Sequence, residues 1–105
     1  MIDLPVPKHL VIGPHEFKVE FDHTICHDES RAGEISFRTQ TIKLDPHQAD
    51  TENQVGLWHE VFHGIASTYG IELEHKDLDR MAVGLTMFLK DNFGAQFNLD
   101  GIEGK

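Results

Sequence analysis

The feature that most constrains the fold is a change in sequence periodicity near Asp45. Before this residue, polar and apolar residues alternate strictly in residues 16–21, which predicts a strand with Phe17, Val19 and Phe21 on one face. After it, apolar residues recur at intervals of three and four, as on one face of a helix. The chain is therefore predicted to be α+β, with the strands first and the helices second.

Two further strands are predicted between Gly33 and Leu44. Ile35 alternates with polar residues in the first of them, and Ile42 does so in the second. The polar residues 38–41 between these segments are interpreted as a hairpin connection. We therefore expect a small antiparallel or mixed sheet of three or four strands.

Two packed helices are predicted to follow the sheet. The first is expected to begin either at Asp45, with Pro46 in the first turn, or at Thr51, which forms a capping-box pattern with Gln54. Gly70 is placed to end it in the left-handed conformation. The apolar stripes of the two helices are Val55, Trp58, Phe62, Ile65, Ala66 and Tyr69, and then Leu78, Met81, Ala82, Leu85, Phe88 and Leu89, before a stop near residues 92–94.

The length of 105 residues predicts one domain, assigned to residues 1–94, followed by a flexible polar tail at residues 95–105. Eighteen acidic and nine basic residues leave a net charge of -9, which opposes binding to nucleic acid or to anionic membranes. The chain has no apolar run long enough to span a membrane and no secretory signal, and Cys26 is its single cysteine. A cytoplasmic location is therefore expected, while the oligomeric state is left open.

A possible metal site lies in the first predicted helix, where residues 59–63 match the pattern His-Glu-x-x-His. His59 and His63 are separated by one helical turn, so both imidazoles can reach one zinc ion at about 2.0–2.1 Å. Glu60 lies beside them and can act as the general base on a water at the open coordination position. The alternative is an exposed helix face with two histidines that bind no metal. The apolar stripe beside the motif favours the metal site.

Other residues that can take part in chemistry are interpreted as structural. Tyr69 can stabilise an oxyanion, but packing or capping at the helix end is the preferred interpretation. His23, Cys26 and His27 form a soft-ligand cluster in a polar loop, which lacks the rigidity of a second metal site. His47 is expected to be exposed in the first turn of a helix.

The order of these elements resembles that of small zincin metallopeptidases. Extended segments at residues 33–35 and 41–44 precede a helix with the sequence His-Glu-x-x-His-Gly-Ile, and a second amphipathic helix follows. The likeness is closest to the short phage and prophage proteins related to ImmA/IrrE-type metallopeptidases and to the minimal gluzincin core, over most of residues 10–93. It implies an edge strand that pairs with substrate, His59 and His63 as zinc ligands, and Glu60 as the catalytic base. A phage-encoded protein of this type would act in the host cytoplasm.

The resemblance also implies a third zinc ligand on the second helix, where relatives have a glutamate. The corresponding position in this chain is His75, with Glu74 beside it as the alternative and Asp79 as a further possibility. Zinc accepts three imidazoles and a water, so His75 is chemically suitable. The metzincin extension is absent, because Tyr69 occupies the position six residues after His63.

The sequence therefore favours a zinc-dependent metallopeptidase-like hydrolase that cleaves an extended peptide or protein substrate. The alternative is a non-catalytic zinc-binding module, either a phage structural protein or a regulatory protein with the same fold. A structural zinc site closes its coordination shell with four protein ligands, whereas a catalytic site leaves one position open for water. Glu60 favours the catalytic alternative, since a purely structural site has no use for a carboxylate beside the metal.

Overall fold

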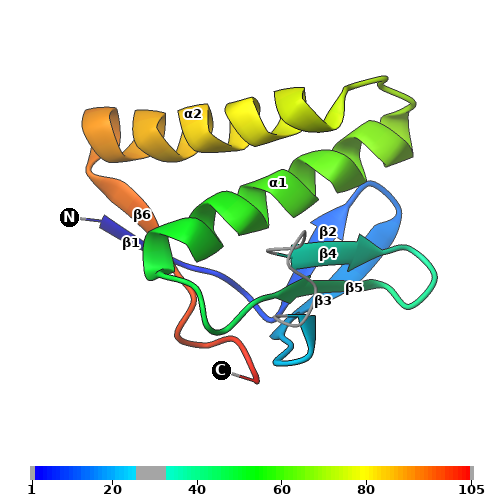
Figure 1. Ribbon diagram of the computed structural model, residues 1–105, viewed down its shortest axis with the longest axis horizontal. Coiled ribbons are helices and arrows are strands. Elements are labelled where there is room, and N and C mark those ends of the chain that lie inside the picture. The colour runs from blue at the N-terminus through cyan, green and yellow to red at the C-terminus, as the bar shows by residue number, and fades with distance from the viewer. Residues whose placement is uncertain (1, 26–32, 105) are drawn as a thin grey trace.

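The computed structural model of the chain describes residues 2–25 and 33–104, and it has the predicted α+β architecture (Figure 1). In these described residues, five strands precede the two helices, and one short strand follows them. In chain order the elements are β1 (Ile2–Pro5), β2 (His9–Ile12), β3 (His15–Phe21), β4 (Gly33–Ser36), β5 (Thr41–Leu44), α1 (Asp50–Tyr69), α2 (His75–Phe93) and β6 (Ala95–Asn98).

The main sheet is mixed and has the strand order β2-β3-β5-β4. The predicted hairpin is confirmed, since β4 and β5 pair antiparallel, whereas β3 and β5 pair parallel. The alternation in β3 is also confirmed, because Phe17, Val19 and Phe21 are all buried in the core. Strand β4 is therefore at one edge of the sheet.

The segment after α2 packs against the core, so the prediction of a loosely held tail is wrong for residues 95–104. Strand β6 pairs in parallel with β1, and Glu103 forms an isolated bridge with Glu20 of the main sheet. Leu99 and Ile102 are 1% and 4% exposed. The prediction failed because the segment is mostly polar and contains glycine, so its few apolar residues gave no periodic pattern. Leu99 and Ile102 become core residues because the segment lies beside β1 and β3. The domain therefore includes this segment.

Helix α1 begins at neither of the two predicted residues. Its first residue is Asp50, after Ala49, and the start has no side-chain capping hydrogen bond. Asp45 instead closes a turn after β5, where its Oδ1 accepts a hydrogen bond of 2.8 Å from the backbone N–H of His47. His47 is exposed, as expected, but lies before the helix. Gly70 ends α1 in the left-handed conformation with a φ of 68°, which confirms that prediction.

Glycines on α1 allow it to lie close to the sheet. A Cβ atom on Gly64 would be 2.8 Å from Cδ1 of Ile12 and 3.0 Å from Cδ1 of Ile35. Gly56, two turns earlier, also faces the sheet, where a Cβ atom would be at an ordinary contact distance of 3.6 Å from Cδ2 of Leu44. Glu60 lies on the helix between these glycines and is buried. The sheet therefore packs against a face of α1 that is rich in glycine and polar residues and that the apolar stripe did not reveal.

Helix α2 runs antiparallel to α1 and covers the side of α1 that faces away from the sheet (Figure 1). Leu78 and Ala82 are buried, as the predicted stripe requires, but Met81 and Phe88 of the same stripe are exposed. Gly94 ends the helix in the left-handed conformation at the predicted place. Within the described part of the chain, neither helix is both long and apolar enough to cross a membrane.

Candidate metal centre

The two histidines of the His-Glu-x-x-His pattern lie near the middle of α1. Because they are separated by four residues in an α-helix, their rings project from the same side, and the ring centroids are 5.5 Å apart. His59 is buried and His63 is half-buried. The motif therefore has the helical geometry from which its chemistry was predicted.

His75, the first residue of α2, completes a group of three histidines. Its ring centroid lies 4.5 Å from that of His59 and 5.5 Å from that of His63. One nitrogen from each ring lies within 4.8 Å of the corresponding nitrogens of the other two. His75 itself is exposed, so the group opens to solvent at the start of α2.

The donor set fits a divalent metal such as zinc. Three neutral imidazoles with an open fourth position form a known catalytic zinc arrangement. Tetrahedral coordination at about 2.05 Å separates ligand atoms by about 3.3 Å. The three nitrogens therefore need to approach one another by at most about 1.5 Å, which side-chain rotation can supply. Within the ranges that the structure describes, these three residues are the group of ligands close enough to hold an ion.

Glu74, the alternative third ligand, lies outside this group. It precedes the first residue of α2, and its carboxylate is exposed and lies 3.3 Å from Nζ of Lys76. His75 and Glu74 differ because they lie on different faces of α2. His75 lies on the face with Leu78 and Ala82, which are buried and pack toward α1. Glu74 shares its stripe with the exposed Met81.

Asp79, the other alternative, contacts His59. Its Oδ1 lies 2.7 Å from Nδ1 of His59, although the contact is bent from the geometry of an ideal hydrogen bond. A carboxylate against one ring nitrogen leaves the other, Nε2, as the metal-binding atom and holds the ring in place. Asp79 is therefore placed to orient a ligand. The sequence analysis named Asp79 only as a possible third ligand; its spacing of four residues from His75 could have indicated that it lies on the same helix face.

The surroundings keep the α1 histidines neutral. Burial lowers the pKa of His59 below its usual value of 6.5, and the neighbouring His75 and His63 add to this effect, while Asp79 opposes it. Burial, and then the charge of His75, also lowers the pKa of His63. Both rings are therefore unprotonated at neutral pH, which is the form that binds a metal.

Glu60 lies in the cleft beside the histidines. It is 5% exposed, and its Oε2 lies 3.5 Å from the position of a Cβ atom on Gly33, the first residue of edge strand β4. A Cβ on Gly33 would also be only 2.9 Å from the backbone oxygen of Lys43. Glycine at this position therefore lets β4 lie close to the backbone of β5, next to the Glu60 carboxylate. The sequence identified Glu60 but gave no reason to single out Gly33.

The cleft that contains these groups has a volume of about 630 Å³. The edge strand β4 forms one wall, α1 forms the floor, and the first turns of α2 form the other wall. Glu34, Glu52 and Ser67 also line it, and the sequence analysis did not select any of the three. Their spacing from the motif on α1 could have revealed Glu52 and Ser67, because both lie on the same helix face as His59 and His63.

The remaining residues of interest lie elsewhere. Tyr69 is 64% exposed at the end of α1, with its hydroxyl next to Gly13, so it does not face the cleft. Nε2 of His23 is 2.7 Å from the backbone oxygen of Gly104, and its ring contacts His47. Cys26 and His27, the other members of the soft-ligand cluster, lie outside the described residues.

No family model matches this chain, and no curated protein and no solved structure is significantly similar to it. What the protein does is therefore inferred from its own residues and their geometry.

Proposed function

We propose that this protein is a zinc-dependent peptidase that hydrolyses an extended peptide. The observation that carries the proposal is the convergence of His59, His63 and His75 in a cleft that also contains the buried carboxylate of Glu60. Three imidazoles can bind an ion, and the carboxylate adds a group that can act as a general base. The cytoplasmic location remains a prediction.

Five residues of the cleft have defined tasks in this proposal. His59, His63 and His75 hold the zinc, which when bound polarises a carbonyl group and lowers the pKa of water. Glu60 accepts a proton from the attacking water on a carboxylate oxygen and then donates it to the amine that leaves. Asp79 keeps the ring of His59 oriented through the contact at Nδ1.

The peptide is proposed to bind along β4. This strand is at the edge of the main sheet and also forms a wall of the cleft, and an extended peptide can add to such an edge as a further strand. Such pairing would position a peptide carbonyl over the histidines by backbone hydrogen bonds, with little dependence on the peptide sequence. Ile35 and Phe37 add apolar surface to the same wall.

The test measures zinc content and peptide cleavage in the wild type and two variants. We expect about one zinc per chain in the wild type, loss of zinc in His63→Ala, and retention of zinc with loss of cleavage in Glu60→Gln. A peptide library with mass-spectrometric detection reports cleavage. Zinc that is bound normally in a protein without any cleavage would support the non-catalytic module instead. Absence of zinc from the wild type, even after addition of zinc, would refute both.

A further inference from the structure

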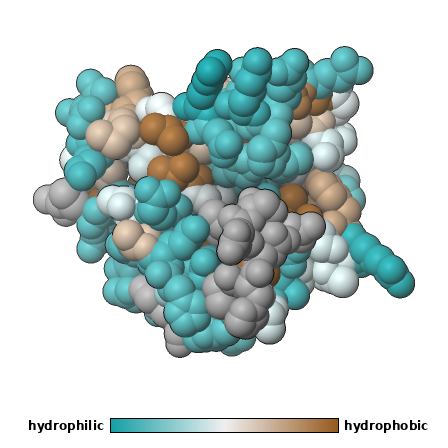
Figure 2. All heavy atoms as spheres, viewed as in Figure 1, coloured by the Kyte–Doolittle hydropathy of each residue, from teal (hydrophilic) through white to brown (hydrophobic). Residues whose placement is uncertain are grey.

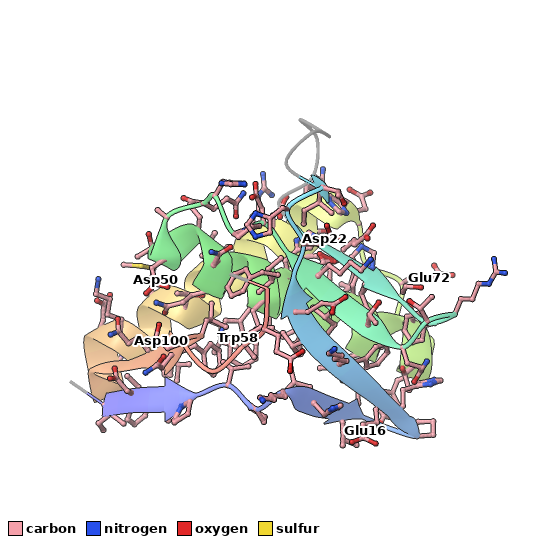
Figure 3. All side chains as sticks on the ribbon, turned by 90° about the horizontal axis from the view of Figure 1, so that it is seen from below. Glu16, Asp22, Asp50, Trp58, Glu72 and Asp100 are labelled. Atoms are coloured by element: carbon pink, nitrogen blue, oxygen red, sulfur yellow. The ribbon has the colours of Figure 1, made fainter. Side chains whose placement is uncertain are left out.

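A second hollow extends the histidine cleft toward the connection between the two helices. Its volume is about 550 Å³, and it shares His63 and Ser67 with the cleft. Its lining includes the apolar side chains of Ile71, Leu73 and Leu78, together with Glu72 and Glu74. Figure 3 shows Glu72 at the end of the molecule where α1 passes into α2. The two hollows are therefore neighbours that share these two residues, and together we call them the groove.

Among the described residues, the charged side chains that line this groove are all acidic. They are Glu34, Glu52, Glu60 and Asp79 in the cleft, and Glu72 and Glu74 in the second hollow. Within residues 2–25 and 33–104, no lysine or arginine lines either hollow. Part of the charge is balanced nearby, since Glu34 pairs in register with Lys43, and Glu74 lies 3.3 Å from Lys76. Glu52 and Glu72, at opposite ends of the groove, extend the negative potential along its length.

The groove is long enough for several residues of a peptide. From Glu52 to Ser67, α1 rises by about 22 Å, at about 1.5 Å per residue. An extended chain covers this distance with about six or seven residues, at about 3.3 Å each. A peptide along β4 therefore passes the acidic groups at more than one of its positions.

We infer that the groove selects peptides that carry lysine or arginine, with one such side chain in the second hollow; this specificity rests on the proposed peptidase function. Lysine and arginine have long aliphatic stems that pack on apolar surface and charged ends that remain near water or a carboxylate. Ile71 and Leu73 offer the apolar surface, and Glu72 and Glu74 offer the carboxylates. The negative potential of a cleft with one sign of charge also attracts cationic ligands before contact.

Acidic residues at this place also have a purely structural explanation. Glu72 and Glu74 lie close to the first turn of α2, where the helix dipole stabilises negative charge. The apolar lining and the continuity with the histidine cleft distinguish the two explanations, because the dipole requires neither. A binding measurement that does not depend on catalysis therefore provides the test.

The experiment uses the full-length Glu60→Gln variant with zinc, so that bound peptide is not cleaved. The probe is a fluorescein-labelled ten-residue peptide of alanine and serine with four lysines, compared with the same peptide with norleucine in place of lysine. Fluorescence anisotropy at low salt is expected to give at least about tenfold tighter binding of the lysine peptide. The preference should shrink at about 0.5 M NaCl, where the screening length is only a few ångströms.

Two further variants in the same background locate the preference. The double variant Glu72→Gln with Glu74→Gln is expected to reduce the ratio of the two Kd values, norleucine peptide over lysine peptide, at least about threefold. The matched control, Glu16→Gln with Asp100→Asn, removes the same charge from two residues that line neither hollow, and it should keep the preference for the lysine peptide. Figure 3 shows both control residues away from Glu72. Equal binding of the two peptides, no binding of either, or equal effects of the two double variants would overturn the inference. A lysine preference in a wild type that cleaves no peptide would refute the peptidase and leave the cationic selectivity established.

Discussion

Replacement of Asp79 by asparagine tests whether this residue positions His59 as a metal ligand. Oδ1 of Asp79 lies 2.7 Å from Nδ1 of His59, and the substitution removes the charge while preserving the shape. Loss of such a partner typically weakens metal binding by about 10–100-fold. Because the Asp79 side chain is 61% exposed, water can replace part of the contact. We therefore expect about a tenfold increase in the zinc Kd, which corresponds to about 1.4 kcal/mol.

The assay is a competition titration in which the protein and a chromophoric chelator share zinc at neutral pH. Asp77→Asn is the matched control, because it removes the same charge from the same helix, and its partner Arg80 is 4.0 Å away on the surface. The control is expected to change the Kd by no more than about twofold, since exposed ion pairs contribute little. If both variants bind zinc equally well and melt at the same temperature, Asp79 does not position His59.

Three further predictions concern the fold. Gly64→Ala should lower the free energy of unfolding, measured by urea titration, by about 1–3 kcal/mol, because the new Cβ would lie 2.8 Å from Ile12. The control Gly84→Ala lies on an open part of α2 and should raise the free energy of unfolding by about 0.5–1 kcal/mol. Equal effects would contradict the close packing of α1 on the sheet. Leu99→Ala should lower the same free energy by about 2–5 kcal/mol, whereas a loosely held tail predicts almost no change. Hydrogen bonds from Thr24 lower the pKa of Asp22 from 3.8 to about 2. Between these two pH values the unfolded state binds more protons than the folded state, so the free energy of unfolding should fall as the pH falls through this window. Asp22→Asn should flatten that part of the pH profile, and an unchanged slope would contradict the assignment.

The periodicity of the sequence was sufficient for most of the fold. The alternation in residues 16–21 reports a strand with one buried face, and β3 has that face. The glycines at positions 70 and 94 end the two helices in the left-handed conformation, where glycine is the least strained residue. These features depend on the backbone geometry of a single element, so the local sequence contains the information.

The start of α1 shows where local patterns fail. Asp45–Pro46 and Thr51 both have sequences typical of helix starts, but the helix begins at Asp50 without a side-chain cap. The carboxylate of Asp45 instead accepts a hydrogen bond from the backbone N–H of His47, in the turn immediately after β5. A capping residue stabilises a helix by only about 1 kcal/mol, and the position of β5 and the packing of α1 on the sheet outweigh it.

By itself, the sequence determined that His59, Glu60 and His63 lie within one turn of a helix, because a spacing of four residues needs only helical geometry. The tertiary structure decided which residue of α2 joins them. His75 and Glu74 are adjacent in sequence and both can bind zinc, but helix packing turns His75 toward α1 and leaves Glu74 in solvent.

The acidic groove has the same origin, since Glu52 and Glu72 belong to separate segments that only packing brings to one surface. In Figure 2, hydrophilic side chains cover most of the visible face, and neither their number nor their type indicates which of them surround the histidines. Long-range proximity depends on how the whole core packs, and no local pattern records it.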